Sequence, residues 1–200
     1  MFYILALLFK PLYFLIFRPR IYGNRAALRT KGKVIFICNH VAMADPFMLA
    51  VISTRIIHFM AKKELFDTPL GKFFFRNLFV FPVNRGRPDV KSVKNAIALL
   101  DKGKAFGIFP EGRRMVADRM DEFELGISLI AIRSGAPVVP IYMSNDCYRK
   151  FRFRYIVGDP IYAEETAVGA TKRENEEIFT ERLSNVMHSL QAQLEEKCGC

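Results

Sequence analysis

A histidine and an aspartate stand five residues apart directly after an apolar segment of the sequence. His40 follows the run KVIFICN, residues 33–39, and Asp45 immediately precedes Pro46. An imidazole beside a carboxylate can remove a proton from a hydroxyl group, because the carboxylate fixes the tautomer of the ring and stabilises the imidazolium that forms. The spacing alone is weak evidence, since an Asp follows a His at a given distance by chance about once in fifteen cases. The pair indicates general-base chemistry only if other residues support it.

Two loops rich in arginine also follow apolar segments. Residues 109–114, FPEGRR, present one carboxylate and two guanidinium groups, and residues 81–87, FPVNRGR, carry two further arginines. A guanidinium group matches phosphate oxygens with two parallel hydrogen bonds, so arginine is favoured where a phosphate must be held in a fixed orientation. These loops predict a substrate that carries a phosphate.

Short apolar runs alternate with amphipathic stretches from residue 33 onward, which is typical of an α/β domain. The runs predict strands at residues 33–39, 56–61, 104–109, 137–143 and 151–157, and helices at 45–54, 88–102, 123–134 and from the capping box Thr171-x-x-Glu174 onward. We therefore expect an α/β fold with a mostly parallel mixed sheet flanked by helices. Ligands of open α/β folds bind at the carboxyl ends of the strands, which is where His40 and both arginine loops are predicted to lie.

Two local features are predicted in more detail. Asp45 is expected to be the N-cap of the helix at 45–54, with Pro46 at the first helical position. The strand at 151–157 alternates aromatic residues with Arg152, Arg154 and Ile156. This pattern predicts one buried face and a place near the edge of the sheet.

The polar segments, taken together, resemble the motifs of the glycerolipid acyltransferase family, and within it those of the 1-acylglycerol-3-phosphate acyltransferases. The motif Asn-His-x4-Asp corresponds to residues 39–45, and the arginine-bearing second motif to VNRG at 83–86. The Pro-Glu-Gly-Thr-Arg motif corresponds to PEGRR at 110–114, and the Val-Pro-Ile motif to 139–141. Four motifs in the family's order are much more specific than any one of them.

The resemblance implies roles for individual residues. It makes His40 the general base and Asp45 the residue that orients it. It also implies a set that holds the glycerol and phosphate of the acceptor, consisting of Arg85, Glu111, Gly112, Arg113 and Arg114. Ala42 and Arg113 stand where family members often have Ser and Thr, and Glu124 where Lys is often found, so the identity of the acceptor stays open.

The implied reaction is transfer of a fatty acyl group from a thioester, acyl-CoA or acyl-ACP, to the free sn-2 hydroxyl of 1-acyl-glycerol-3-phosphate, which gives phosphatidic acid. The donor is a substrate, and we expect no bound cofactor and no metal. Glycerol-3-phosphate, another lysophospholipid or an amino-lipid are alternative acceptors. A peripheral membrane-binding module without catalysis is the alternative from another functional class. The four cysteines show no C-x-x-C spacing and are expected to be reduced thiols.

The charge of the chain is unevenly distributed. The formal net charge is +10, and residues 1–44 contain no Asp or Glu. The apolar run at residues 2–17 is shorter than the roughly twenty residues needed to cross a bilayer, so we expect a helix that lies in the membrane interface, with a buried core helix as the alternative. The basic tract that follows favours anionic headgroups, and no nucleic-acid motif is recognised.

These features predict a membrane-associated enzyme on the cytoplasmic face. We divide the chain into residues 1–32, a membrane-anchoring helix with a basic linker, and residues 33–200, the acyltransferase domain. Residues 65–81 are rich in phenylalanine and include two cations, Lys72 and Arg76. This segment suits either an interfacial or acyl-lining surface or an ordinary core helix and strand.

Overall fold

The structure, a computed structural model, describes residues 2–84, 89–114, 120, 122–166 and 171–198. It contains a seven-stranded sheet with the order β1-β7-β6-β2-β5-β3-β4. The strands are β1 Arg20–Gly23, β2 Val34–Cys38, β3 Ile57–Lys62, β4 Val80–Val83, β5 Ala105–Ile108, β6 Val138–Met143 and β7 Arg154–Val157. The pairing of β6 with β7 is antiparallel, and the other pairings among these strands are parallel. The predicted α/β fold with a mostly parallel mixed sheet is confirmed.

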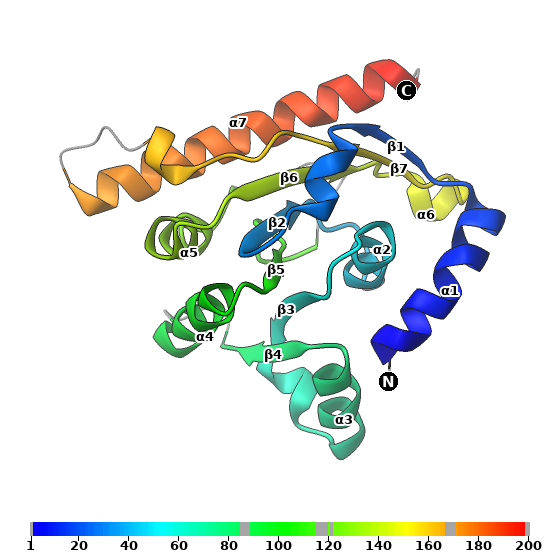
Figure 1. Ribbon diagram of the computed structural model, residues 1–200, viewed down its shortest axis with the longest axis horizontal. Coiled ribbons are helices and arrows are strands. Elements are labelled where there is room, and N and C mark those ends of the chain that lie inside the picture. The colour runs from blue at the N-terminus through cyan, green and yellow to red at the C-terminus, as the bar shows by residue number, and fades with distance from the viewer. Residues whose placement is uncertain (1, 85–88, 115–119, 121, 167–170, 199–200) are drawn as a thin grey trace.

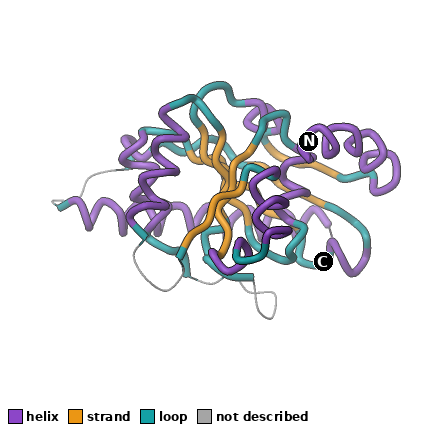
Figure 2. The backbone as a smooth tube through the Cα atoms, turned by 90° about the horizontal axis from the view of Figure 1, so that it is seen from below, coloured by secondary structure: helices purple, strands orange, loops and turns teal. Residues whose placement is uncertain are grey.

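Helices cover both faces of the sheet (Figure 1). They are α1 Phe2–Phe17, α2 Asp45–Ile52, α3 Pro69–Asn77, α4 Val90–Asp101, α5 Gly126–Ser134, α6 Cys147–Lys150 and α7 Lys172–Cys198, with short 3-10 helices η1 Arg25–Arg29, η2 Lys63–Phe66 and η3 Ala163–Glu165. Residues of α1, α2 and α3 pack in one apolar core, and residues of α4, α5 and α7 in the other. Figure 2 shows the strands between these two groups of helices.

The central strand β2 explains why its sequence is a continuous apolar run. All five of its residues are buried. Phe36 belongs to the core on one face, whereas Ile35 and Ile37 belong to the core on the other. A strand covered on both faces has no solvent side on which polar residues would alternate.

Local sequence signals fix several helix ends. Asp89 caps α4, because its side chain accepts a hydrogen bond of 3.0 Å from the Ser92 N–H. Gly135 ends α5 in the left-handed conformation, with φ of 58°. The capping box of α7 is formed, since the Glu174 N–H donates to Thr171 Oγ1 (3.1 Å) and the Thr171 N–H donates to Glu174 Oε2 (2.9 Å).

The structure corrects one of the two predictions made for the strand at 151–157. β7 does not have a single buried face, because Tyr155 packs in one core and Ile156 in the other. β7 does lie near the edge of the sheet, as predicted, because only β1, which pairs with it from Arg20 to Gly23, lies outside it. The sequence did not predict β1, which lies within the basic segment described above as a linker.

The N-terminal helix α1 packs on the domain through one side. Tyr13 is buried, whereas Leu15 and Ile16 are exposed. Lys10 lies on the inner side and its Nζ donates a hydrogen bond of 2.9 Å to the Ser53 carbonyl. None of the helices in the described residues has both the length and the hydropathy needed to cross a membrane.

Candidate active site

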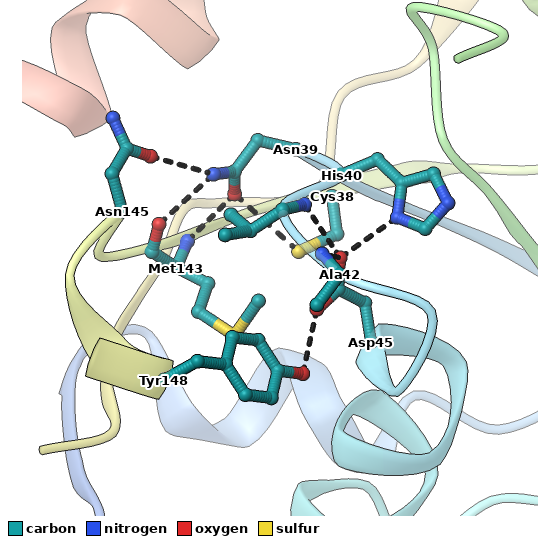
Figure 3. Close-up of polar contacts among 9 residues, drawn as sticks. Cys38, Asn39, His40, Ala42, Asp45, Met143, Asn145 and Tyr148 are labelled. Atoms are coloured by element: carbon teal, nitrogen blue, oxygen red, sulfur yellow. Dashed lines mark hydrogen bonds and ion pairs between the residues drawn. The ribbon is translucent and has the colours of Figure 1, made fainter. Parts of the chain in front are cut away.

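Asn39 fixes the chain where β2 ends. Its side chain is fully buried and pairs with the end of the neighbouring strand β6. Asn39 Nδ2 donates to the Met143 carbonyl (2.9 Å), and the Met143 N–H donates to Asn39 Oδ1 (2.8 Å), as Figure 3 shows. A side-chain amide that pairs with both groups of one backbone residue is held in a single orientation. The residue that follows, His40, therefore leaves the sheet at a fixed position.

Asp45 connects the loop after β2 to the start of α2. Its carboxylate is 1% exposed. Oδ2 lies 2.7 Å from His40 Nδ1 and accepts the N–H groups of Val41 (2.6 Å) and Ala42 (2.8 Å) (Figure 3). The predicted pair of His40 and Asp45 is thus in contact.

The N-cap role predicted for Asp45 is wrong. Ala44 is the N-cap of α2, and Asp45 is already the first helical residue, with Pro46 in the first turn. The carboxylate binds amides that precede it in the chain, Val41 and Ala42, rather than those of the helix that follows. These contacts close the loop that carries His40.

The geometry defines which nitrogen of His40 is available. Because the Asp45 carboxylate accepts at Nδ1, the neutral ring carries its proton there and has a lone pair on Nε2. The side chain is 14% exposed, so the ring is accessible from one side. Nε2 can therefore take the proton of a substrate hydroxyl, while Asp45 stabilises the imidazolium that results.

Two stacked phenylalanines set the plane of the His40 ring. Phe109, the residue after β5, stacks on the imidazole with a centroid distance of 4.2 Å and an interplanar angle of 20°. Phe59 of β3 stacks in turn on Phe109, at 6.0 Å and 10°. The ring is thus supported by side chains from two neighbouring strands.

The loop after β5 brings Glu111 to the same edge of the sheet. β2 and β5 are parallel, with Ile37 opposite Ile108, so the loops that follow the two strands leave the sheet at the same edge. Glu111 is 4% exposed, and its charge contributes to the electrostatic environment of Cys38 at the end of β2. Gly112 turns the loop with φ of 64°, a conformation that favours glycine.

The structure describes two of the three predicted phosphate ligands. Arg113 and Arg114 follow Glu111 in the same loop, and both are exposed. Arg85 lies outside the described residues. The structure therefore brings His40, Asp45 and Glu111 to one edge and places two arginines beside them on the surface.

The thiols near His40 are held in their neutral form. Burial, followed by the charge of Asp45, raises the pKa of Cys38 well above its usual range. The same two causes raise the pKa of Cys147 to about 12. A neutral thiol is a poor nucleophile. The raised pKa values therefore favour general-base chemistry by His40 over nucleophilic attack by Cys38 or Cys147.

Two other features of the described residues bear on the location of the site. Within the described part of the chain, no group of three or more His, Cys, Asp or Glu side chains is arranged to hold a metal ion. A hollow of about 400 Å³ on α7 is lined by Ile178, Arg182 and Val186 among others. None of the residues discussed above lines that hollow.

Similarity to known proteins decides the family. The family model described as Acyltransferase matches residues 19–144. The chain belongs to the acyltransferase family. The match includes His40, Asp45 and the loop at 109–114, so the proposed chemistry of these residues falls within the matched segment of this acyltransferase.

Several relatives of this acyltransferase share the name 1-acyl-sn-glycerol-3-phosphate acyltransferase. The chain is 31% identical over 179 residues to a 1-acyl-sn-glycerol-3-phosphate acyltransferase of Bacillus subtilis, which covers 86% of this chain and 88% of that protein. It is 31% identical over 120 residues to the enzyme of that name from Cocos nucifera, covering 56% of this chain and 38% of the longer plant protein.

A solved structure shares the fold of this acyltransferase. The crystal structure of the 1-acyl-sn-glycerophosphate (LPA) acyltransferase PlsC from Thermotoga maritima superposes with a TM-score of 0.70 at 19% identity. The superposition covers 97% of this chain and 79% of that one. The likeness shows a common fold over nearly the whole chain.

Three residues around the site were not predicted from the sequence of this acyltransferase. Phe109 is predicted at the junction of a strand and an arginine loop, without a contact to His40. Asn145 and Tyr148, which follow β6, received no role, although Asn145 Oδ1 lies 3.3 Å from Asn39 Nδ2 and Tyr148 donates a hydrogen bond to Asp45. The sequence separation of more than a hundred residues hides these contacts from local patterns.

Proposed function

We propose that this acyltransferase transfers a fatty acyl group from a thioester to the free sn-2 hydroxyl of 1-acyl-glycerol-3-phosphate, giving phosphatidic acid in phospholipid biosynthesis. The observation that carries the proposal is the contact of 2.7 Å between His40 Nδ1 and the buried Asp45. The name of the Bacillus subtilis relative, which matches 86% of this chain, supports the acceptor.

The reaction proceeds by direct transfer. His40 Nε2 removes the proton of the sn-2 hydroxyl as that oxygen attacks the thioester carbonyl, and the tetrahedral intermediate then breaks its C–S bond. The imidazolium returns its proton to the thiolate that leaves. Orienting the hydroxyl against the carbonyl supplies much of the rate enhancement. The thioester is acyl-CoA or acyl-ACP, both anionic, and the net charge of +10 suits either.

The acceptor is held by residues at the same edge of the sheet. We assign Glu111 and Gly112 to the glycerol, because Glu111 is buried at the end of β5 beside the end of β2. Arg113 and Arg114 are assigned to the phosphate, since they are exposed in the same loop. Arg85 keeps the phosphate-binding role that its motif implies.

The acceptor assignment can be tested directly. Purified protein is given a saturating acyl thioester and, in turn, 1-acyl-glycerol-3-phosphate, glycerol-3-phosphate, a neutral monoacylglycerol and an amino-lipid. We expect the highest kcat/KM with 1-acyl-glycerol-3-phosphate. A higher value with another acceptor would replace the proposed substrate, and lipid binding without any transfer would favour a non-catalytic membrane module.

Arg114→Lys is expected to weaken use of the acceptor. Lysine keeps the charge but loses the planar fork, so one charge-assisted contact to the phosphate is lost. Such a loss corresponds to about 1.5–3 kcal/mol, or roughly a ten- to hundredfold lower acceptor kcat/KM. Arg113→Lys and Arg85→Lys extend the test. Kinetics are measured with the acceptor varied at saturating donor, and then the reverse.

Arg173→Lys is the control for this test, because Arg173 is exposed on α7 and pairs with Glu177 at 2.9 Å. Its acceptor kcat/KM is expected to stay within twofold of wild type. Equal effects of Arg114→Lys on donor and acceptor kinetics would contradict a contact with the acceptor phosphate.

We also propose that the enzyme associates with the cytoplasmic face of a membrane, with residues 1–32 as the anchoring segment. Support comes from apolar side chains exposed on the face of the sheet that carries α1, α2 and α3. They are Phe9, Leu12, Leu15 and Ile16 of α1, Met43 and Phe47 beside the site, and Leu70 and Phe73 of α3. Exposed cations accompany them, namely Arg18 and Arg20 after α1 and Lys72 and Arg76 on α3. Apolar residues beside cations suit the interface of an anionic bilayer.

The double substitution Leu15→Asp, Ile16→Asp is expected to release the enzyme from anionic vesicles. These side chains are 68% and 60% exposed, so the changes spare the buried Tyr13, which a deletion of α1 would remove. Losing two apolar anchors, each contributing about 1.5–3 kcal/mol when fully buried, should lower vesicle affinity more than tenfold. Sedimentation with phosphatidylglycerol vesicles measures it.

A control is Ile178→Asp, which places a single new carboxylate on the exposed part of α7 behind the other face of the sheet. Its vesicle affinity is expected to match wild type. Unchanged sedimentation of the Leu15→Asp, Ile16→Asp protein would show that another surface, such as α3, provides the anchor.

A further inference from the structure

A tyrosine far from the motif residues contacts the buried aspartate of the site. Tyr148 belongs to the short helix α6, and its hydroxyl donates a hydrogen bond of 2.7 Å to Asp45 Oδ1 (Figure 3). Oδ2 of the same carboxylate is occupied by His40 Nδ1 and two backbone amides. Tyr148 therefore binds the oxygen that the loop itself does not hold.

The Tyr148 ring is fixed by aromatic packing. It makes an edge contact with Phe153, at a centroid distance of 5.3 Å and an interplanar angle of 88°. Phe153 is 3% exposed and makes edge contacts with Tyr13 (5.6 Å) and Phe17 (5.3 Å) of α1. Edge-to-face pairs are favourable and directional, so the hydroxyl has a defined position.

Tyr148 stays a donor over the pH range in which enzymes are assayed. Burial, followed by the charge of Asp45, raises the pKa of its hydroxyl far above the usual value. The other titratable groups that act on it are the thiols of Cys147 and Cys38, whose pKa values burial also raises. An ionised carboxylate has no proton to donate, so in this contact the protonated hydroxyl is the donor.

We propose that Tyr148 is a positioning residue for the base of the reaction. By holding Oδ1, it keeps Oδ2 directed at His40 Nδ1 and at the two amides, so that Nε2 faces the acceptor hydroxyl. The inference rests on the proposed function of His40 and adds a residue that belongs to none of the four motifs. Its action passes through Asp45 and involves no contact with substrate.

Tyr148→Phe tests this role, because it removes the hydroxyl and keeps the ring packed on Phe153. Loss of a hydrogen bond to a charged group should lower kcat by about ten- to a hundredfold. The KM values for donor and acceptor should stay within twofold, since Tyr148 does not bind either. In an Asp45→Ala background the same change should cause no further loss.

The matched control is Tyr155→Phe, which also removes a buried tyrosine hydroxyl, one that lies 3.0 Å from the Tyr13 hydroxyl. It is expected to lower the melting temperature without changing kcat. A kcat for Tyr148→Phe within twofold of wild type would overturn the proposal. An equal loss in wild-type and Asp45→Ala backgrounds would do the same, since it would indicate a general structural effect.

A spectroscopic arm separates this inference from the proposed function. The chain contains three histidines, so NMR of histidine-labelled protein resolves the imidazole of His40 from the other two. The Nδ1–H signal of His40 is expected to shift in Tyr148→Phe and to stay unchanged in Tyr155→Phe. This result would hold even if the wild type used another acceptor, and an unchanged signal in Tyr148→Phe would overturn the positioning role.

Discussion

Replacing His40 with alanine is expected to lower the rate of acyl transfer by about a hundred- to ten-thousandfold, which is the usual contribution of a general base. No other described residue places an imidazole against Asp45, so nothing replaces its Nε2. The fold should persist, because the side chain lies at the end of a strand and is partly exposed. Initial rates with saturating donor and acceptor, together with the melting temperature, measure both expectations.

His188→Ala is the control for this prediction, since His188 is exposed on α7. It should leave turnover and stability close to wild type. If the folded His40→Ala protein turned over within tenfold of wild type, His40 would not be the base.

The second large effect is expected for Asp45→Asn. The amide keeps the shape of the side chain and can still accept from the loop amides, but it removes the negative charge that stabilises the imidazolium. We expect kcat to fall by about a hundred- to ten-thousandfold, as for a histidine base that is held in the wrong tautomer. Stability should change by no more than about 1–2 kcal/mol, measured by denaturant unfolding.

Asp45→Ala serves as the comparison, because it leaves the N–H groups of Val41 and Ala42 and the hydroxyl of Tyr148 without their acceptor. Each such buried donor costs about 1–3 kcal/mol, so this variant should be much less stable than Asp45→Asn. Activity of Asp45→Asn within tenfold of wild type would show that orientation alone, without charge, is sufficient.

Much of the fold could be predicted because its signals are local. The run at 33–39 is apolar throughout, as a strand covered on both faces requires, and the strand β2 lies within it. The capping box at Thr171 and the glycine at 135 mark helix ends through hydrogen bonds within a few residues. Such signals need no knowledge of the tertiary structure.

The missed elements depend on tertiary contacts. β1 is four residues long, begins with an arginine and has no alternating apolar pattern. It forms because it pairs with β7, which is more than a hundred residues away in the sequence. The cover on the second face of β7 comes from residues such as Leu190 of α7, which no pattern within 151–157 could indicate. The same holds for the direction of the Asp45 carboxylate, which is set by the loop before it.

The candidate site divides in the same way into residues that the sequence predicts and a residue that only the folded chain reveals. His40, Asp45 and Glu111 carry motif patterns and lie at the ends of adjacent parallel strands, so topology alone brings them together. Tyr148 is separated from Asp45 by 103 positions and belongs to no motif. Its contact depends on how α6 packs after β6, which only the folded chain defines.

The most direct test of the central claim is the structure of the product. Purified protein is incubated with an isotopically labelled acyl thioester and unlabelled 1-acyl-glycerol-3-phosphate, and the lipids are analysed by mass spectrometry after cleavage by a lipase specific for the sn-2 position. The proposed function predicts phosphatidic acid with the label released from sn-2, and none above background with His40→Ala. Labelled free fatty acid as the sole product, or label on a different acceptor or position, would contradict it.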